Sequence, residues 1–173
     1  MRILIWHGYL LGGTGSNVYT RALAREWSRA GHVVVVVCQD RQAERYDLGG
    51  AGVVVPELPG GLLPVFVLDE YEGLDARLLP DFTAEQRDAY VDANAAVLRE
   101  LLPADLVFAN HVLMGGPVAC ASGARYAVKA HGSELEYSMR GNADLSRLGA
   151  EALAGAEAVF VGSEHIRGVL EDV

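Results

Sequence analysis

The run HVVVVVC, residues 32–38, limits the fold of this chain more than any other stretch. β-Branched side chains fit the pleated surface of a strand, so the five consecutive valines predict extended backbone. Successive residues of a strand point to opposite faces of a sheet, and here both faces are apolar. A strand of this kind lies inside a parallel sheet that helices cover from both sides.

Shorter apolar runs alternate with helix-period segments along the rest of the chain. We predict further strands at residues 2–6, 52–55, 64–69, 104–110, 125–130 and 157–162. We predict helices at residues 16–30, 83–102, 144–155 and 163–173, and Thr83 with Gln86 forms a capping box for the second. The small-residue segment 115–123 gives no helix or strand signal, and residues 131–142 are expected to form an irregular loop.

Strands that alternate with helices in this way imply right-handed βαβ units. We therefore expect residues 1–173 to form one α/β domain, a three-layer, Rossmann-like, doubly wound fold around a mostly parallel sheet. The last predicted helix runs to Val173 without a glycine or proline stop. Because natural domains seldom end in that way, we expect the chain to be part of a longer protein.

Composition and charge narrow the class of partner and the compartment. Asp and Glu total 23 and Lys and Arg total 14, which gives a formal net charge of −9. Such a chain repels the phosphates of DNA, RNA and anionic lipids unless a local basic patch intervenes, so nucleic acid is not expected as a partner. Cys38 and Cys120 lie in apolar contexts and are expected to be buried, reduced thiols. We see neither a membrane helix nor a signal peptide and expect a cytoplasmic protein.

Polar residues collect where the predicted strands end, which is where open parallel sheets bind ligands. These residues are His7 with the glycine loop after it, Asp40, Asp69, Glu70, Tyr71, His111, His131, Ser163, Glu164 and His165. Four of the five histidines are among them, and only His32 lies at the start of a strand. We therefore expect the imidazoles and the glycine loop to crowd a single edge of the molecule.

The loop GGTGSN, residues 12–17, joins the first predicted strand to the first helix. Gly12, Gly13 and Gly15 let the backbone take positive φ and approach a ligand closely. The helix that begins near Ser16 presents free N–H groups and the positive end of its dipole, which suits a phosphate or diphosphate. A turn capped by Ser16 or Thr14, with no ligand, explains the same residues equally well.

The loop departs from the dinucleotide-binding fingerprint G-x-G-x-x-G, because Val18 stands where the third glycine belongs. Asp40, after the second strand, imitates the acid that binds a ribose. Residues 8–11 lengthen the loop and lift its glycines away from the tip of the strand. These features favour a sugar nucleotide. A stand-alone nucleotide-binding module, or half of an NAD(P)-dependent oxidoreductase, stays the alternative.

Several stretches, in this order and spacing, resemble the N-terminal domain of GT-B fold glycosyltransferases, specifically the retaining family four (group 1) enzymes. They are the GGTGSN loop, VVVVC, HGSELEY at residues 131–137 and VFVGSEHIRGVL at residues 159–170. The resemblance covers essentially the whole chain. It implies transfer of a sugar from a nucleotide-diphosphate sugar to a small-molecule, glycan or lipid-linked acceptor, with no cofactor and no obligate metal. A lipid acceptor would place the enzyme peripherally at the inner face of the membrane.

The resemblance also implies roles for individual residues. Gly12, Gly13, Thr14 and Gly15 would reach the donor diphosphate, and His131 would lie against the donor sugar as the catalytic residue. The acceptor side of the cleft would be lined by His7, His111, Gly132, Ser133, Glu134, Ser163 and Glu164. The family's donor-binding C-terminal domain is absent from these 173 residues, so the chain alone is expected to be inactive.

Other interpretations find less support in the sequence. His7, His111 and His131 lack the close spacing of metal ligands. Ser133 follows His131, but no G-x-S-x-G elbow accompanies it, which counts against a hydrolase. A flavodoxin-like or receiver module would have acidic clusters at the strand ends, where histidines and glycines dominate here. Glutamates 134 and 136 are interpreted as part of a solvated loop face.

Overall fold

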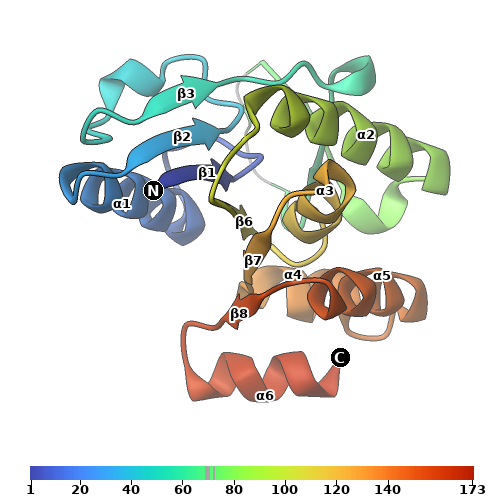
Figure 1. Cartoon of the computed structure of the whole chain (residues 1–173). Coiled ribbons are helices and arrows are strands. Elements are labelled where there is room, and N and C mark those ends of the chain that lie inside the picture. Colours follow the sequence, from blue (N-terminus) through green and yellow to red (C-terminus); the bar gives the residue numbers. More distant parts are fainter. Residues whose placement is uncertain (69–70, 72) are drawn as a thin grey trace.

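The computed structural model describes residues 1–68, 71 and 73–173. Its main sheet has six parallel strands in the order β3-β2-β1-β6-β7-β8 (Figure 1). The strands are β1 Arg2–Trp6, β2 Val33–Val37, β3 Gly52–Val54, β6 Leu106–Asn110, β7 Tyr126–Lys129 and β8 Ala158–Phe160. A second, two-stranded parallel sheet pairs β4 Leu62–Val65 with β5 Asp75–Leu78. The doubly wound, parallel α/β fold predicted from the sequence is therefore confirmed.

Helices cover both faces of the main sheet. They are α1 Gly15–Arg29, α2 Ala84–Leu101, α3 Gly115–Ser122, α4 Gly132–Glu134, α5 Ala143–Ala154 and α6 Glu164–Asp172. A π-helical turn, η4 Leu135–Met139, and three 3₁₀ turns, η1 Ala43–Arg45, η2 Pro59–Gly61 and η3 Leu79–Asp81, complete the elements. The predicted capping box is present, because Thr83 Oγ accepts from the Gln86 amide at 3.2 Å and Gln86 Oε1 accepts from the Thr83 amide at 3.0 Å. Nowhere in the described residues does a helix have both the length and the apolar character that a membrane crossing requires.

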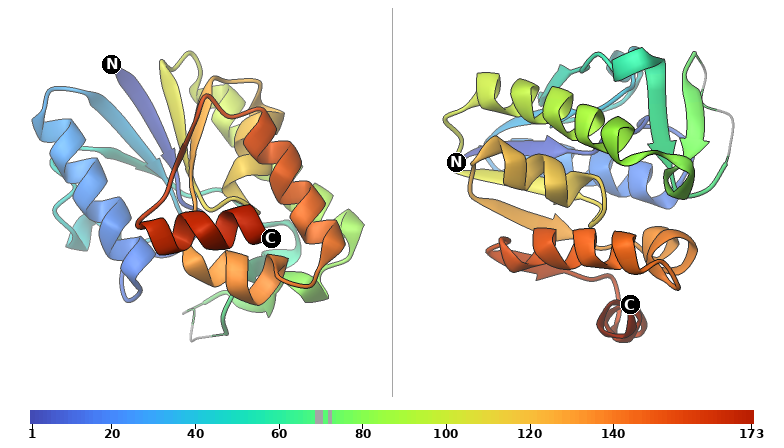
Figure 2. Two further views of the ribbon diagram at one scale, coloured as in Figure 1. Left: turned by 90° about the horizontal axis from the view of Figure 1, so that it is seen from below. Right: turned by 90° about the vertical axis from the view of Figure 1, so that its right-hand side faces the viewer.

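Two separate cores lie on the two faces of the sheet, because alternate residues of a strand point in opposite directions. Leu4 and Trp6 of β1 belong to the core shared with α2, α3 and α5. Ile3 and Ile5 belong to the core on the other face, which includes Ala24 of α1. Figure 2 shows α1 and α5 on opposite sides of the strands. The apolar character of both faces thus follows directly from the chain's valine and isoleucine runs.

Three predicted segments differ from the structure. The strand predicted at 64–69 begins and ends earlier, as β4, and Asp69 and Glu70 lie outside the described residues. Strand β5 was missed because its sequence, DARL, contains no apolar run. Residues 115–122 form helix α3 despite two glycines and a proline, and part of the predicted loop 131–142 folds as α4 and η4.

Helix α3 depends on a close approach that only small residues permit. A Cβ atom at Gly116 would lie 2.7 Å from Cβ of Ala152, which belongs to α5. Glycine therefore weakens the local helix signal but allows the two helices to pack. The predicted burial of both cysteines is right for Cys38 and wrong for Cys120, which is exposed on this helix.

Candidate active site

Three loops meet at the carboxyl end of the main sheet. Residues 8–14 follow β1, His111 follows β6, and His131 follows β7. The ring centroid of His111 lies 6.2 Å from that of His7 and 4.6 Å from that of His131. The prediction that imidazoles and the glycine loop share one edge is confirmed for these three histidines.

The site residues predicted after β8 do not contact the histidine cluster. Ser163, Glu164 and His165 are exposed at the start of α6. Ser163 Oγ caps this helix by accepting from the amide of Ile166 at 3.2 Å, and Glu164 lies 3.6 Å from Arg167. The structure therefore gives Ser163 and Glu164 contacts within α6 and not with the histidine cluster.

His7 joins the glycine loop to α1. Its Nε2 lies 2.8 Å from Asn17 Oδ1 and 3.1 Å from the carbonyl oxygen of Leu10, so a proton on Nε2 satisfies both acceptors. Asn17 in turn donates from Nδ2 to the carbonyl oxygen of Gly12. Burial lowers the pKa of His7 to about 4, against the opposing effect of these hydrogen bonds. The ring is therefore neutral at neutral pH and holds the loop in place.

A buried amide extends these contacts to His131. Asn110, the last residue of β6, donates from Nδ2 to Thr20 Oγ at 2.9 Å, and its Oδ1 lies 3.3 Å from His131 Nε2. Thr20 Oγ lies 3.1 Å from His7 Nδ1, which closes the connection to the loop. We call Asn17, His7, Thr20, Asn110 and His131 the buried polar network. It runs from the glycine loop to the histidine after β7 without a break.

His131 itself is partly buried and uncharged at neutral pH. Burial lowers the pKa of His131 to about 3, and the nearby Lys129 ammonium and His7 act in the same direction. The ring can therefore donate or accept a hydrogen bond but does not supply a positive charge. Its main-chain N–H donates to Glu134 Oε1 at 2.9 Å, which fixes the turn that starts α4.

Glu134 is fully buried, so its interpretation as a solvated loop residue is wrong. The α4 turn points the side chain inward, where Oε1 accepts from His131 N and Oε2 accepts from Leu113 N at 3.1 Å. Burial raises the pKa of Glu134 to about 7, although the backbone donors oppose the shift. The carboxyl thus connects the loop after β6 to the loop after β7. Glu136, by contrast, pairs with Arg140 at 2.7 Å near the surface.

His111 is buried, but neither ring nitrogen has a hydrogen-bond partner among the described residues. Its backbone has a φ of 74°, a left-handed conformation that is rare for a residue other than glycine. Burial lowers the pKa of His111 well below its usual range, with smaller effects from His131 and His7. The hydroxyl of Tyr9 is also buried, and it has no hydrogen-bond partner among the described residues. Buried polar groups without a partner are uncommon, and the described residues contain others, the hydroxyls of Ser28 and Ser138.

Tyr9 and His111 both line one small cavity, which we call the histidine cavity. Its volume is about 290 Å³, and Phe66, Ser133 and loop residues 14–17 are also among its lining. Ser133 thus lies on the wall of a cavity next to the glycine loop, and its role toward an acceptor stays a prediction. Gly132 is tightly placed beside α6, since a Cβ there would lie 3.1 Å from Cδ1 of Ile166. Within the described residues, no group of three or more His, Cys, Asp or Glu side chains is arranged to hold a metal ion.

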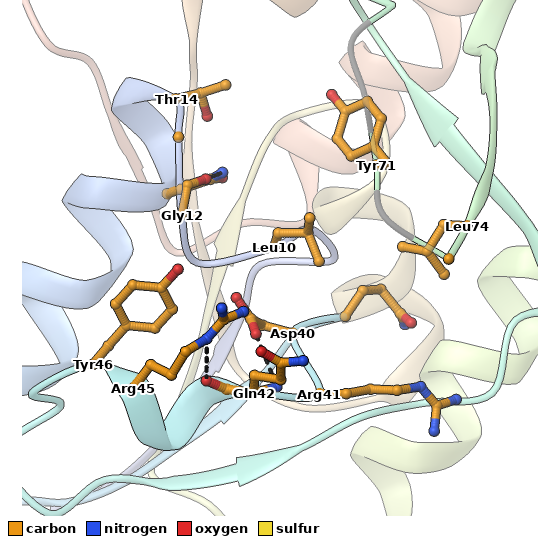
Figure 3. Close-up of a pocket in the computed structure, with 14 residues that line it drawn as sticks. Leu10, Gly12, Thr14, Asp40, Arg41, Gln42, Arg45, Tyr46, Tyr71 and Leu74 are labelled. Carbon is orange, nitrogen blue, oxygen red and sulfur yellow. Dashed lines mark hydrogen bonds between the residues drawn. The ribbon is translucent and has the colours of Figure 1, made fainter.

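A larger cavity of about 860 Å³ lies on the other side of the glycine loop, and we call it the arginine pocket. In Figure 3, Gly12 and Thr14 form one wall, Tyr71 and Leu74 the opposite wall, and Asp40, Arg41, Gln42 and Arg45 the floor. Asp40 accepts from the amide of Leu11 and from the amide of Gln42, each at 3.0 Å. These two bonds hold the buried Asp40 side chain between the loops after β1 and β2, and the ribose-binding role that the sequence suggested for it stays a prediction.

The start of α1 leaves its first N–H groups available. Thr14 is the N-cap residue, but its side chain makes no capping hydrogen bond and lies 3.2 Å from Ser16 Oγ. The interpretation of the loop as a turn capped by the Ser16 or Thr14 side chain is therefore not supported. Gly13 has a φ of +85° and open space where a Cβ would lie. The first turn also contains no acidic residue that would repel an anion.

Four polar residues of this region did not stand out in the sequence. Asn17, Thr20 and Asn110 are buried in the polar network. Lys129, also buried, donates from Nζ to the carbonyl oxygen of Ala130 at 3.0 Å, and burial lowers its pKa. The sequence does mark two of these four residues, because Asn110 and Lys129 are the polar last residues of otherwise apolar strands. Asn17 and Thr20 are three residues apart on one helix face, which tertiary contacts alone identify as the buried face.

Comparisons with known proteins agree with this geometry. A family model described as "Glycosyl transferase 4-like domain" matches residues 14–172. The fold is similar to that of a sucrose-phosphate synthase from Thermosynechococcus elongatus, with a TM-score of 0.66 and 14% identity over 99% of this chain and 44% of that one. It is also similar to MurG from Acinetobacter baumannii, with a TM-score of 0.53 and 14% identity over 94% of this chain and 41% of that one. No curated protein has a matching sequence. The chain thus spans less than half the length of these two solved structures.

Proposed function

Because the chain belongs to the glycosyl transferase 4-like domain family, we propose that it forms the acceptor-side half of a sugar transferase. In this proposal the enzyme moves a sugar from a nucleotide-diphosphate sugar to an acceptor hydroxyl and retains the anomeric configuration. The family match favours transfer over a dinucleotide-dependent oxidoreductase.

The observation that carries the proposal is the cavity beside the glycine loop, whose wall includes Tyr9, His111 and Ser133. A sugar hydroxyl both donates and accepts hydrogen bonds, so it suits a wall built from two hydroxyl-bearing residues and an imidazole. The cavity adjoins the glycine loop through Thr14, Gly15 and Ser16. A sugar held there would have its diphosphate within reach of that loop.

The loop and the start of α1 would hold the donor diphosphate. Gly13 exposes the backbone without a side chain in the way, and the uncapped N–H groups of α1 point toward the same space. Backbone N–H groups are fixed dipoles, and they stabilise charge that develops on a leaving phosphate without any proton transfer. Thr14 and Gly15 would shape this contact.

His131 would act as the catalytic residue by hydrogen-bonding a hydroxyl of the donor sugar. Its low pKa keeps the ring neutral, so the proposed role is orientation and not protonation. Asn110 Oδ1, 3.3 Å from Nε2, helps to fix the orientation of the ring. The leaving phosphate would take the proton of the acceptor hydroxyl, and the protein would supply position and electrostatic stabilisation.

The rest of the catalytic site would come from a donor-binding domain. This chain spans 44% and 41% of the two solved structures that its fold matches, so the whole enzyme's activity stays a proposal. We propose that the complete enzyme works in the cytoplasm and needs no obligate metal. We further propose that the isolated chain binds ligands but does not turn them over.

A matched pair of glycine variants tests the loop. Gly13 and Gly31 have φ values of +85° and +87° and open space at Cβ, at opposite ends of α1. Replacing either by alanine should cost about 1–2 kcal/mol of stability, because alanine is strained at positive φ. Only Gly13→Ala should raise the KM for the donor in the complete enzyme. Equal donor kinetics in the two variants would contradict the proposed diphosphate contact.

A second pair tests His131. In the complete enzyme, His131→Ala should lower kcat by about 10²-fold or more, the usual effect of removing one transition-state hydrogen bond. His165→Ala, at an exposed histidine of α6, is the control and should leave kcat unchanged. If His131→Ala loses folding stability and activity in parallel, the residue is structural and the assignment fails.

A further inference from the structure

The buried polar network begins at two backbone carbonyl oxygens of the glycine loop, which can only accept hydrogen bonds. Asn17 donates from Nδ2 to the carbonyl oxygen of Gly12, so its Oδ1 is the atom that faces His7. His7 Nε2 lies 2.8 Å from this Oδ1 and 3.1 Å from the carbonyl oxygen of Leu10. Because both neighbours are acceptors, Nε2 is the ring nitrogen that carries the hydrogen.

The next step of the network fixes the amide of Asn110. Burial keeps the pKa of His7 at about 4, so the ring is neutral at neutral pH and its Nδ1 can only accept. The hydroxyl of Thr20 has one hydrogen and two acceptors within reach, His7 Nδ1 at 3.1 Å and the carbonyl oxygen of Ser16 at 2.9 Å. Thr20 Oγ therefore has lone pairs, and no second hydrogen, for Asn110 Nδ2 at 2.9 Å. A reversed Asn110 amide would take the hydrogen of Thr20 and leave the buried Nδ1 of His7 without a donor.

The last step reaches the ring of His131. With Asn110 Nδ2 bonded to Thr20, the amide oxygen Oδ1 faces His131 Nε2 at 3.3 Å. An amide oxygen only accepts, so Nε2 of His131 carries the hydrogen and Nδ1 of the neutral ring has none. Asn110 is fully buried at the end of β6, where water cannot replace either of its partners. The carbonyl oxygens of the glycine loop thus determine which nitrogen of His131 is protonated.

We propose that Asn110 is a positioning residue that holds His131 in the tautomer with the hydrogen on Nε2, so that Nδ1 can only accept a hydrogen bond. The contact with the donor sugar then has one direction, because a sugar hydroxyl that reaches Nδ1 has to donate its hydrogen. The proposal rests on the transferase function proposed above. It adds a residue and a direction to the contact of His131.

The first test is NMR spectroscopy of this chain, labelled with ¹⁵N, at neutral pH. Long-range ¹H–¹⁵N spectra distinguish a protonated ring nitrogen from an unprotonated one, and the variant His131→Ala identifies the signals of that ring. Both His7 and His131 should have the hydrogen on Nε2 in the parent chain. A His131 ring protonated on Nδ1, or an equal mixture of the two tautomers, would overturn the proposal. This measurement needs no change in the network itself, so it decides even where a network variant does not fold.

Two variants test the transmission through the network. Asn110→Ala removes the partner of His131, and Thr20→Val removes the group that orients Asn110, although Thr20 bonds to the amide and not to His131. Each variant should lower the ratio of the two His131 tautomers by about tenfold, the usual effect of one hydrogen bond. An unchanged ratio in Asn110→Ala would contradict the proposed role.

The matched control is Asn94→Ala. Asn94 is as fully buried as Asn110, and it accepts from Trp6 Nε1 at 3.2 Å and donates to the carbonyl oxygen of Tyr90 at 2.9 Å. Its loss should destabilise the fold to a similar extent and leave the tautomer of His131 unchanged. Equal changes of the tautomer ratio in Asn94→Ala and Asn110→Ala would reduce the effect to a loosened core and overturn the proposal.

Turnover in the complete enzyme tests whether Asn110 acts through His131. Asn110→Ala should lower kcat by about fivefold to tenfold and change the KM for the donor less, because the contact is strongest in the transition state. In a His131→Ala background, Asn110→Ala should cause no further loss of kcat. Losses that multiply in the double variant would show that Asn110 acts independently and would refute its positioning role.

The two kinds of measurement separate this proposal from the proposed function. If Asn110→Ala changes the tautomer ratio and leaves kcat of the complete enzyme unchanged, the tautomer assignment stands and the proposed catalytic role of His131 fails. If kcat falls while the tautomer ratio stays constant, the positioning role of Asn110 is wrong and the transferase function stands.

Discussion

Gly116 lies where α3 and α5 are in closest contact, and replacing it by alanine tests the packing that supports the site. The added Cβ would lie 2.7 Å from Cβ of Ala152, whereas carbon atoms pack best at about 3.5–4.0 Å. The two helices must therefore separate by about 1 Å. This overpacking costs about 1–3 kcal/mol, and the better helix propensity of alanine returns about 1 kcal/mol. We expect Gly116→Ala to lose up to about 2 kcal/mol net, which lowers the Tm by up to about 8 °C in a chain of this size.

Two further variants make this prediction sharp. Gly168, in the middle of α6, has an ordinary φ and open space at Cβ, so Gly168→Ala should gain about 0.5–1 kcal/mol from helix propensity alone. The double variant Gly116→Ala/Ala152→Gly moves one methyl group across the contact and should recover part of the loss. Urea and thermal unfolding of the parent, these three variants and the single variant Ala152→Gly would measure these differences. A Gly116→Ala protein as stable as the Gly168→Ala protein, or a strictly additive double variant, would refute the reasoning.

Two other predictions concern pH and helix capping. Acidification from about pH 6.5 to 4 should destabilise the domain, because His7 and His131 stay neutral in the fold, with pKa values of about 4 and about 3, while the unfolded chain protonates them. Glu134, with its pKa raised to about 7, opposes the trend by up to one proton, so the net loss in urea unfolding should be small near pH 6.5 and reach about 1.4 kcal/mol per pH unit near pH 5. The loss should be steeper in Glu134→Gln, and a flat profile would contradict this. Thr83→Ala should remove the capping box and lower stability by about 1 kcal/mol, and an unchanged Tm on thermal unfolding would speak against it.

The sheet was predictable because its strands are short apolar runs, and an apolar composition predicts burial. The parallel pairing of β1 with β2 follows from two strands that are apolar on both faces, whereas their register, with Ile5 opposite Val36, does not, because a one-residue slip would bury apolar side chains equally well. Helix α3 was not predictable from local propensity, since glycines 115 and 116 disfavour a helix. Only tertiary contacts explain them, because a Cβ at Gly115 would meet the carbonyl oxygen of Asn110 in β6, and one at Gly116 would meet Ala152 in α5. Strand β5 was missed for the opposite reason, because its alternating DARL sequence carries too weak a signal.

The candidate site, like the fold, was predicted from the sequence only in part. The rule that ligands bind at the carboxyl ends of parallel strands brought His7, His111 and His131 together correctly. No sequence rule predicts that Glu134 turns inward, because charged residues in irregular segments are usually solvated. Its burial follows from a single helical turn and two backbone donors, and neither is visible in the chain's periodicity.

The buried polar network has a consequence for the energetics of binding. Asn17 holds the carbonyl oxygen of Gly12, and His7, Thr20 and Asn110 continue the contact to the opposite loop. The conformational entropy of the glycine loop is therefore lost when the domain folds and not when a substrate arrives. A ligand that reaches this edge meets a preorganised surface, and its intrinsic affinity is not reduced by ordering the loop.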